Sequence, residues 1–373
     1  MKDYKIALIH DWLVTIAGAE SVLSTIYELY PADIFTLVSN TDALRGTIFE
    51  NATVYESFIK KMPFSIKHYR KYLPIMPLAI EDFDLRDYDI VISSSHAVAK
   101  GVLTSSRQLH ISYIHTPMRY AWDMYHLYLK QAGLQGSLKG LLAKLILHYL
   151  RLWDYQSIDR VDYIIANSNY VKKRIYKIYK RDSEVIYPPV DLSGFDYQKK
   201  KDDYFITISR LVPYKRIDLI VTAFSQMPEL RLIVIGDGPD MDKISSLAKS
   251  NIELLGWQSK DHLKDYLESA RAFVFSAEED FGIVPVEAQA CGCPVIAYSQ
   301  GGTSETVVNG KTGIFFHSQS VDAIMKGVRE FIQIENSFDS KTIRENAERF
   351  SKDKFKSAFT NFVETKVKVF FNE

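Results

Sequence analysis

The sequence predicts an α/β protein with two parallel-sheet domains, and three observations lead to that prediction. Short apolar runs bounded by turn residues alternate with longer helical patterns along the chain, as they do in parallel α/β sheets. A chain of 373 residues exceeds what a single hydrophobic core usually supports. The composition, with 47% hydrophobic and 25% charged residues, is that of a globular protein and excludes a disordered or fibrous chain.

The predicted strands form two series, separated by a proline pair. The first series is expected at residues 5–9, 34–37, 90–93, 109–114 and 163–167, and the second at residues 204–209, 232–236, 252–254, 272–276 and 294–297. Pro188 and Pro189 stiffen the chain between the two series and cannot continue a helix or a central strand, so they are interpreted as the interdomain linker.

The domain boundaries follow from this linker. We expect a Rossmann-like domain at residues 1–187, a second one at residues 188–350, and a C-terminal helix at residues 351–373 that can cross back to the first domain. The two domains are expected to face a central cleft, because ligands of such folds bind beyond the carboxyl ends of the strands.

Charge and cysteine content narrow the class of protein. Lys plus Arg and Asp plus Glu number 46 each, so no overall field attracts nucleic acid. Cys291 and Cys293 are too close in sequence to staple a fold and too few for a zinc site, and they fit a reducing cytosol. The chain starts without an apolar signal region and has no apolar run of roughly 18 residues, the length of a membrane span. We therefore expect a cytoplasmic protein.

Two familiar nucleotide motifs are incomplete. Gly236 and Gly238 begin like a dinucleotide fingerprint but lack its third glycine, which disfavours a nicotinamide enzyme. Gly310 to Thr312 resemble the end of a phosphate loop, but Glu305 stands where a glycine is needed. This second segment is interpreted as a surface turn between a short helix and a strand.

The strongest chemical signal is a pair of glutamates in the second domain. Glu279 and Glu287 have seven residues between them, and Glu279 directly follows a predicted strand. Pro285 suits a first helical turn, so Glu287 is expected further along the same helix. Gly282 and the free backbone N–H groups after it would then form an anion site at the start of that helix.

A basic turn supplies the second signal. Arg210 and Lys215 follow a predicted strand and enter a helix, where two cations can converge on a diphosphate. Such fixed cations stabilise the negative charge that a leaving nucleoside diphosphate gains, without a metal ion. The alternative of solvated charges at a helix start fits Arg216 better than these two residues.

These motifs resemble those of the retaining glycosyltransferases of family 4, which have the GT-B fold. The segment from Glu279 to Glu287 is similar to the family's Glu-seven-Glu motif, and Arg210 and Lys215 match its cation positions. The resemblance implies that Glu279 contacts the hydroxyls of the donor sugar and that Glu287 holds the nucleotide ribose. The donor-binding set that it implies is Gly18, Arg210, Lys215, Gly236, Glu279, Phe281, Gly282, Ile283, Val284 and Glu287.

The first domain carries the candidates for the acceptor side. His115 follows a predicted strand where the family places a histidine near the transferred sugar, and its surroundings resemble bacterial polysaccharide mannosyltransferases. The resemblance thus implies a catalytic set of Glu279, His115, Arg210 and Lys215. Further acceptor candidates at strand ends are Asp11, His96, Lys100, Arg119 and Trp122.

A basic and aromatic segment at residues 58–72 adds a possible contact with lipid. Its cations include Lys60, Lys61, Arg70 and Lys71, with aromatic residues between them. Such a segment can lie on an anionic membrane and bind a lipid diphosphate. A solvated helical face is an equally good interpretation of the pattern.

The resemblance implies a retaining transfer of mannose from GDP-mannose to a saccharide on a polyprenyl diphosphate, in the synthesis of a bacterial surface polysaccharide such as the O-antigen of lipopolysaccharide. It implies no cofactor and no metal, and a peripheral position on the inner face of the cell membrane. A UDP-hexose donor on the same scaffold, a nucleotide-sugar epimerase and a non-catalytic lipid-binding protein are the alternatives. The basic segment disfavours the epimerase, and the set of Glu279, Glu287, Arg210 and Lys215 disfavours the lipid-binding protein.

Overall fold

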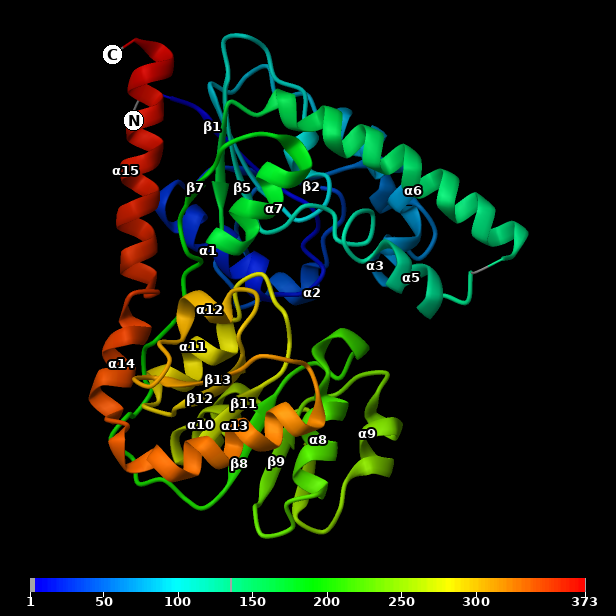
Figure 1. The fold of residues 1–373 in the computed structure, drawn as a ribbon. Helices are drawn as coiled ribbons and strands as arrows, with labels where there is room; N and C mark the ends of the chain where they lie inside the picture. The colour runs from blue at the N-terminus through cyan, green and yellow to red at the C-terminus, as the bar shows by residue number, and fades with distance from the viewer. Residues whose placement is uncertain (1–3, 135, 373) are drawn as a thin grey trace. The chain divides into compact units, whose positions relative to one another are not determined.

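The computed structural model describes residues 4–134 and 136–372. Two compact units divide the chain (Figure 1). The first unit runs to Pro189 and takes up the chain again at Phe355, and the second unit is Val190–Lys354. The chain therefore leaves the first unit two residues after the predicted boundary at residue 187 and re-enters it four residues after the predicted boundary at residue 350.

The first unit is built on a seven-stranded parallel sheet in the order β3-β2-β1-β4-β5-β6-β7. Its strands are β1 (Ile6–His10), β2 (Asp33–Thr36), β3 (Val54–Glu56), β4 (Ile90–Ser95), β5 (Leu109–Ile114), β6 (Tyr163–Ala166) and β7 (Glu184–Val185). Its α-helices are α1 (Gly18–Leu29), α2 (Thr41–Leu44), α3 (Ser65–His68), α4 (Met76–Glu81), α5 (Tyr125–Gln131), α6 (Leu138–Ser157), α7 (Asn169–Tyr179) and most of α15 (Lys352–Phe371). Short 3₁₀ helices occur at Phe58–Lys61, Tyr69–Ile75, Ala99–Gly101 and Ile158–Arg160.

Alternation along the strands places apolar side chains on both faces of this sheet. In β1, Leu8 belongs to one core cluster, whereas Ala7 and Ile9 belong to the other. Helices α1 and α15 cover the Leu8 face, and α4 and the C-terminal half of α6 cover the other. A sheet buried on both faces needs apolar residues at successive positions, which is why its strands are continuous apolar runs in the sequence.

The second unit has a six-stranded parallel sheet in the order β10-β9-β8-β11-β12-β13. Its strands are β8 (Phe205–Ile208), β9 (Leu232–Ile235), β10 (Ile252–Gly256), β11 (Ala272–Phe275), β12 (Val295–Tyr298) and β13 (Gly313–Phe316). Its α-helices are α8 (Ile217–Ser225), α9 (Met241–Leu247), α10 (Lys260–Ser269), α11 (Ile283–Ala290), α12 (Thr303–Thr306), α13 (Val321–Ile334) and α14 (Ser340–Glu348), with 3₁₀ helices at Pro213–Lys215 and Glu335–Ser337.

The two sheets confirm the predicted fold class of two Rossmann-like parallel α/β domains. All ten predicted strands are present, with ends that differ by a few residues at most. The three strands that the sequence did not predict, β3, β7 and β13, lie at sheet edges. The turn expected at residues 310–312 lies between the short helix α12 and β13. Within the described ranges, no helix has both the length and the apolar character that a bilayer span requires.

Candidate functional site

Three neighbouring strands of the first unit carry a histidine at or directly after their carboxyl ends: His10, His96 and His115. Strands β1, β4 and β5 are adjacent in the sheet, and Asp11, His96 and His115 follow them directly. The ring centroids of His96 and His115 lie 6.2 Å apart. The indole of Trp12 contacts the His96 ring edge-on at 4.5 Å. The sheet order thus gathers residues that are about 20 to 100 positions apart in the sequence, as expected at the carboxyl ends of parallel strands.

Asp11 is the buried anchor of this site. Its carboxylate accepts hydrogen bonds from the backbone N–H groups of residues 96–99, at 2.7, 3.0, 2.6 and 2.7 Å. Burial alone would raise the pKa of Asp11, but the charges of His96 and His10 and these N–H donors hold it below its usual value. Because the side chain is fully buried and both oxygens are occupied, the prediction that Asp11 binds the acceptor is wrong. Its role is to fix the turn that carries His96.

His115 remains a candidate for contact with a ligand. Its side chain is half-buried, and its Nε2 lies 2.8 Å from the hydroxyl of Ser94. Burial, followed by the nearby charges of His96 and His10, lowers the pKa of His115 well below its usual value. The ring is therefore neutral near pH 7, and it can share a hydrogen bond with a hydroxyl without adding a positive charge.

Lys100 lies inside the first unit. Its ammonium group is buried against the carboxylate of Asp154, which also accepts hydrogen bonds from Trp122 Nε1 at 2.7 Å and from the Tyr179 hydroxyl at 2.8 Å. The prediction that Lys100 lines an acceptor pocket is therefore wrong. The polar atom of Trp122 is also used within the fold, which leaves only part of its half-buried ring for an acceptor. Arg119 is half-buried one turn away.

The basic residues of the segment 58–72 differ in their surroundings: some are bonded within the fold and others are exposed. Lys60 is tied into the fold by Glu56 at 2.6 Å and by the carbonyl oxygen of Ser39 at 2.8 Å. Arg70 lies close enough to His96 for its charge to lower the pKa of that histidine, although burial is the largest cause. Lys61 and Lys71 are exposed. Arg70 and Lys67 are exposed as well, so Lys61, Lys67, Arg70 and Lys71 keep the character of an exposed basic surface.

In the second unit, Lys215 and Glu279 form an ion pair at the ends of neighbouring strands. Lys215 follows β8 and Glu279 follows β11, which is the next strand in the sheet. Both side chains are mostly buried. Between them, the hydroxyl of Ser276 donates to the carbonyl oxygens of Lys215 and Arg216, both at 2.9 Å. Ser276, which the sequence analysis missed, thus fixes the backbone of the basic turn.

The side chain of Arg210, in the same basic turn, is exposed to solvent. It has no hydrogen bond or ion pair with any other described residue. Arg216 was predicted to be a solvated charge at a helix start, and in the structure its guanidinium pairs with Asp218 at 3.3 Å. Across residues 4–134 and 136–372, no group of three or more His, Cys, Asp and Glu side chains is arranged to hold a metal ion.

A glycine pair supports the loop that carries Glu279. The N–H of Gly302 donates to the carbonyl oxygen of Glu279 at 2.7 Å. A Cβ atom at residue 302 would come within 2.2 Å of the Cα atom of Phe281, so only glycine allows this approach. Gly301 and Gly302 were not predicted as site residues, although two adjacent glycines in the loop that follows the predicted strand at 294–297 are a signal for such a close approach of two backbones.

Helix α11 begins at this loop. Gly282 precedes it with a φ of 87°, and no side chain caps the first N–H groups of the helix, at Ile283 and Val284. Glu287 lies on the same helix and is half-buried. Burial raises its pKa, Asp191 raises it further, and Lys260 opposes both. The ring of Phe281 is buried against Phe350, so of the predicted donor residues Phe281 can offer only its backbone.

Two predicted glycines occupy different local settings. Gly18 is the first residue of α1, where the Glu20 carboxylate accepts the N–H of Ala17 at 2.9 Å. Gly236 follows β9, and a Cβ atom there would come within 1.8 Å of the carbonyl oxygen of Ser209. The loop after β9 therefore packs backbone to backbone on the loop that precedes Arg210.

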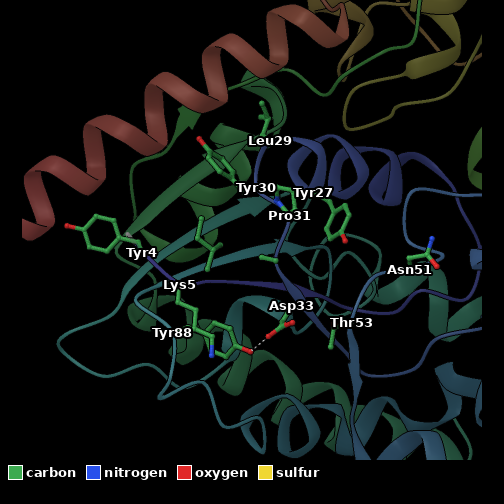
Figure 2. A pocket seen from close by; sticks show the side chains of 12 residues that line it. Tyr4, Lys5, Tyr27, Leu29, Tyr30, Pro31, Asp33, Asn51, Thr53 and Tyr88 are labelled. Carbon is green, nitrogen blue, oxygen red and sulfur yellow. Dashed lines mark hydrogen bonds between the residues drawn. The ribbon is translucent and has the colours of Figure 1, made fainter. Parts of the chain in front are cut away.

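A pocket of about 720 Å³ opens on the first unit, at the end of the sheet away from these loops (Figure 2). Tyr4, Tyr30 and Tyr88 are among its lining residues. The hydroxyl of Tyr88 donates to Asp33 at 2.5 Å, as Figure 2 shows. The pocket lies beside the first residues of β1 and β2, so it is separate from the loops at the carboxyl ends.

Comparisons with known proteins cover almost the whole chain. A family model described as Glycosyltransferase Family 4 matches residues 27–193, and one described as Glycosyl transferases group 1 matches residues 194–352. An uncharacterized glycosyltransferase of Methanocaldococcus jannaschii is 31% identical over 196 residues, which are 51% of this chain and 55% of that protein. The chain spans about half the length of the curated relatives that it matches.

Solved structures share the fold over nearly the full length. The lipopolysaccharide outer core galactosyltransferase WaaB is 19% identical with a TM-score of 0.69, covering 97% of this chain and 99% of that chain. Anabaena Alr3699/HepE, solved in complex with UDP, is 18% identical with a TM-score of 0.69, covering 97% and 100%.

Proposed function

We propose that the chain transfers a hexose from a nucleotide sugar with retention of configuration. The reason is that it belongs to the glycosyltransferases, with a family 4 domain at residues 27–193 and a group 1 domain at residues 194–352. The observation that carries this proposal is the ion pair of Lys215 and Glu279 beside the uncapped start of α11. The cation and the free N–H groups there match the diphosphate of a nucleotide sugar, and the carboxylate of Glu279 matches its sugar hydroxyls.

The roles of the charged residues follow from the chemistry of the leaving group. A nucleoside diphosphate gains negative charge as the bond to the sugar breaks, and Lys215 and Arg210 can stabilise that charge together with the N–H groups of α11. In this mechanism Glu279 orients the sugar hydroxyls, and the acceptor attacks on the face from which the diphosphate leaves. No covalent intermediate with the protein is needed, and no metal ion takes part.

For the donor we propose GDP-mannose, on the resemblance of the residues around His115 to mannosyltransferases. A UDP-hexose is the second candidate, and one finding favours it: Anabaena Alr3699/HepE, which shares the fold, binds UDP. For the acceptor we propose a saccharide on a polyprenyl diphosphate, bound by the first domain near His96 and His115. The protein would then work at the inner face of the cell membrane, with Lys61, Lys67 and Lys71 close to the lipid headgroups.

The function is tested by incubating the protein with GDP-mannose, UDP-glucose and UDP-galactose in the presence of a lipid-linked saccharide acceptor. We expect release of nucleoside diphosphate to be fastest with GDP-mannose, and the product linkage to keep the donor's anomeric configuration by NMR. A chelator should leave the rate unchanged, because protein cations carry the charge stabilisation. Loss of activity in EDTA that magnesium or manganese restores would contradict the metal-independent mechanism.

The two glutamates are expected to separate binding from transfer. Glu279→Gln should abolish transfer, because the amide orients the sugar poorly, but it should retain binding of free nucleoside diphosphate. Since Glu279 neutralises Lys215 in the free protein, the variant should bind the diphosphate as well as wild type or better. Isothermal titration with GDP measures this, with Glu287→Gln as the comparison that should weaken binding. Much weaker binding by Glu279→Gln would show that the division of roles is wrong.

A further inference from the structure

Helix α6 has apolar side chains on two faces, and only one of these faces packs into the first unit. Leu150 and Trp153 are buried on the inner face. The outer face exposes a set of apolar residues, which we call the α6 stripe: Leu138 (83% exposed), Leu141 (54%), Leu142 (58%), Leu145 (58%), Tyr149 (43%) and Leu152 (60%). They recur every three or four positions, which aligns them along one side of a helix with 3.6 residues per turn. A continuous exposed apolar surface of this kind marks a binding face.

Helix α5 extends the same surface. Leu127 and Tyr128 of α5 are also exposed. The guanidinium of Arg151, on α6, lies over the ring of Tyr125 at 4.9 Å and donates to the carbonyl oxygen of Ala121 at 3.0 Å. Arg151 therefore ties the start of α5 and the segment before it to α6.

The exposed charged residues of α5 and α6 are all basic, and two carboxylates next to these helices, Asp123 and Glu81, are paired with Arg174 and Arg160. Residues 124–153 contain no Asp or Glu, whereas Lys130, Lys139, Lys144 and Arg151 lie in this range. The three lysines are exposed, and the next acidic residue along the chain, Asp154, is buried. An exposed Leu and Tyr stripe on a helix whose own exposed charges are all basic has the composition of a helix that lies in the interface of an anionic membrane.

We propose that the α6 stripe docks the chain on the surface of an anionic phospholipid bilayer. A second copy of the chain fits the stripe less well, because pairing two such faces would bring the exposed lysines of the two helices together. This proposal rests on the membrane location given under the proposed function. The stripe adds apolar side chains that can insert into the bilayer, whereas Lys61, Lys67 and Lys71 offer only charge.

The buried side of α6 gives this docking a consequence for the acceptor loops. Asp154 lies on that side and binds Lys100, whose own N–H donates to the hydroxyl of Ser95 at 3.2 Å. Residues 96–99, directly before Lys100, form the turn that Asp11 holds. A helix resting on the bilayer would thus hold the turn of His96 at a fixed distance from the membrane, where the head of a lipid-linked saccharide is presented.

The test is co-sedimentation of the full chain with phosphatidylcholine vesicles, with and without phosphatidylglycerol. We expect binding only with the anionic lipid, and at least tenfold weaker binding for the Leu141→Gln, Leu145→Gln double variant. The matched control is Leu103→Gln, Val369→Gln, which removes two similarly exposed apolar residues elsewhere in the first unit and should bind as wild type. Wild-type binding by the Leu141, Leu145 variant would overturn the proposal.

Further measurements separate this proposal from the others. Transfer to a short soluble acceptor should be the same for wild type and for the Leu141, Leu145 variant, so its loss in the variant would place the stripe in the fold. If wild type transfers sugar but binds neither kind of vesicle, the docking proposal fails while the proposed function stands. If wild type is a dimer by sedimentation equilibrium and the variant a monomer, with no effect on vesicles, the stripe binds a second copy and the proposal is overturned.

Discussion

The Lys215→Ala variant is expected to lose about 100-fold or more of its turnover while it keeps its fold, which is the size of effect seen when transition-state charge stabilisation is removed. Lys215 is mostly buried and touches Glu279, so its loss removes a cation from the diphosphate and leaves the carboxylate without its partner. Both consequences act on the chemical step. Single-turnover kinetics with radiolabelled GDP-mannose measure that step directly.

Two further variants test whether the loss of turnover is specific to cations that contact the diphosphate. Arg210→Ala should also lower turnover strongly, although Arg210 is exposed in the free protein, because a bound diphosphate would supply its partner. Lys243→Ala is the control: its exposed ammonium group pairs with Asp218 at 2.8 Å in the same unit, and its loss should change turnover by less than about twofold. Turnover of Lys215→Ala close to that of Lys243→Ala would remove Lys215 from the mechanism.

The largest expected effect on stability is at Lys100. Replacing Lys100 with Met keeps the length of the side chain but leaves the Asp154 carboxylate buried without its cation. Removing one member of a buried ion pair typically costs about 3–5 kcal/mol of the free energy of unfolding. Because Trp122 and Tyr179 still donate to Asp154, we expect a loss of about 3 kcal/mol, at the lower end of that range.

Tryptophan fluorescence can assign this loss to the first unit. Trp12, Trp122 and Trp153 lie in the first unit, and Trp257 is the one tryptophan of the second. Urea unfolding in a Trp257→Phe background therefore reports on the first unit alone. Lys61→Met, which alters an exposed lysine of the same unit, is the control and should change stability by less than about 0.5 kcal/mol. An equal effect of Lys100→Met and Lys61→Met would show that the buried pair adds little.

The sequence predicted the central strands well because parallel strands buried on both faces are continuous apolar runs. It did not predict β3 and β7, since these edge strands are short and have no fully buried residue, nor β13, an edge strand of four residues that are mostly buried. The return of the C-terminal helix was predicted from its pattern alone. In the structure, Phe355 and Phe359 of that helix pack into the core of the first unit.

For the candidate site, the sequence indicated positions but not burial. Asp11 and Lys100 follow strands just as His96 and His115 do, and nothing local distinguishes a charge that faces a ligand from one that holds a loop. Their bonding partners show that both charges hold the fold. Asp11 accepts from the N–H groups of residues 96–99, and Lys100 pairs with Asp154, which is 54 residues away. Such pairings arise only when the sheet brings distant loops together.

Helix α15 has a consequence for how the chain is made on the ribosome. The second unit lies, in sequence, between two parts of the first. Phe355, Phe362 and Val363 of α15 complete the core that also contains Leu8 of β1. Residues 190–354 therefore leave the ribosome and can fold while one face of the first sheet is covered only in part, by α1. During that interval the nascent first unit exposes an apolar surface that a chaperone can bind, and synthesis of the last helix ends the exposure.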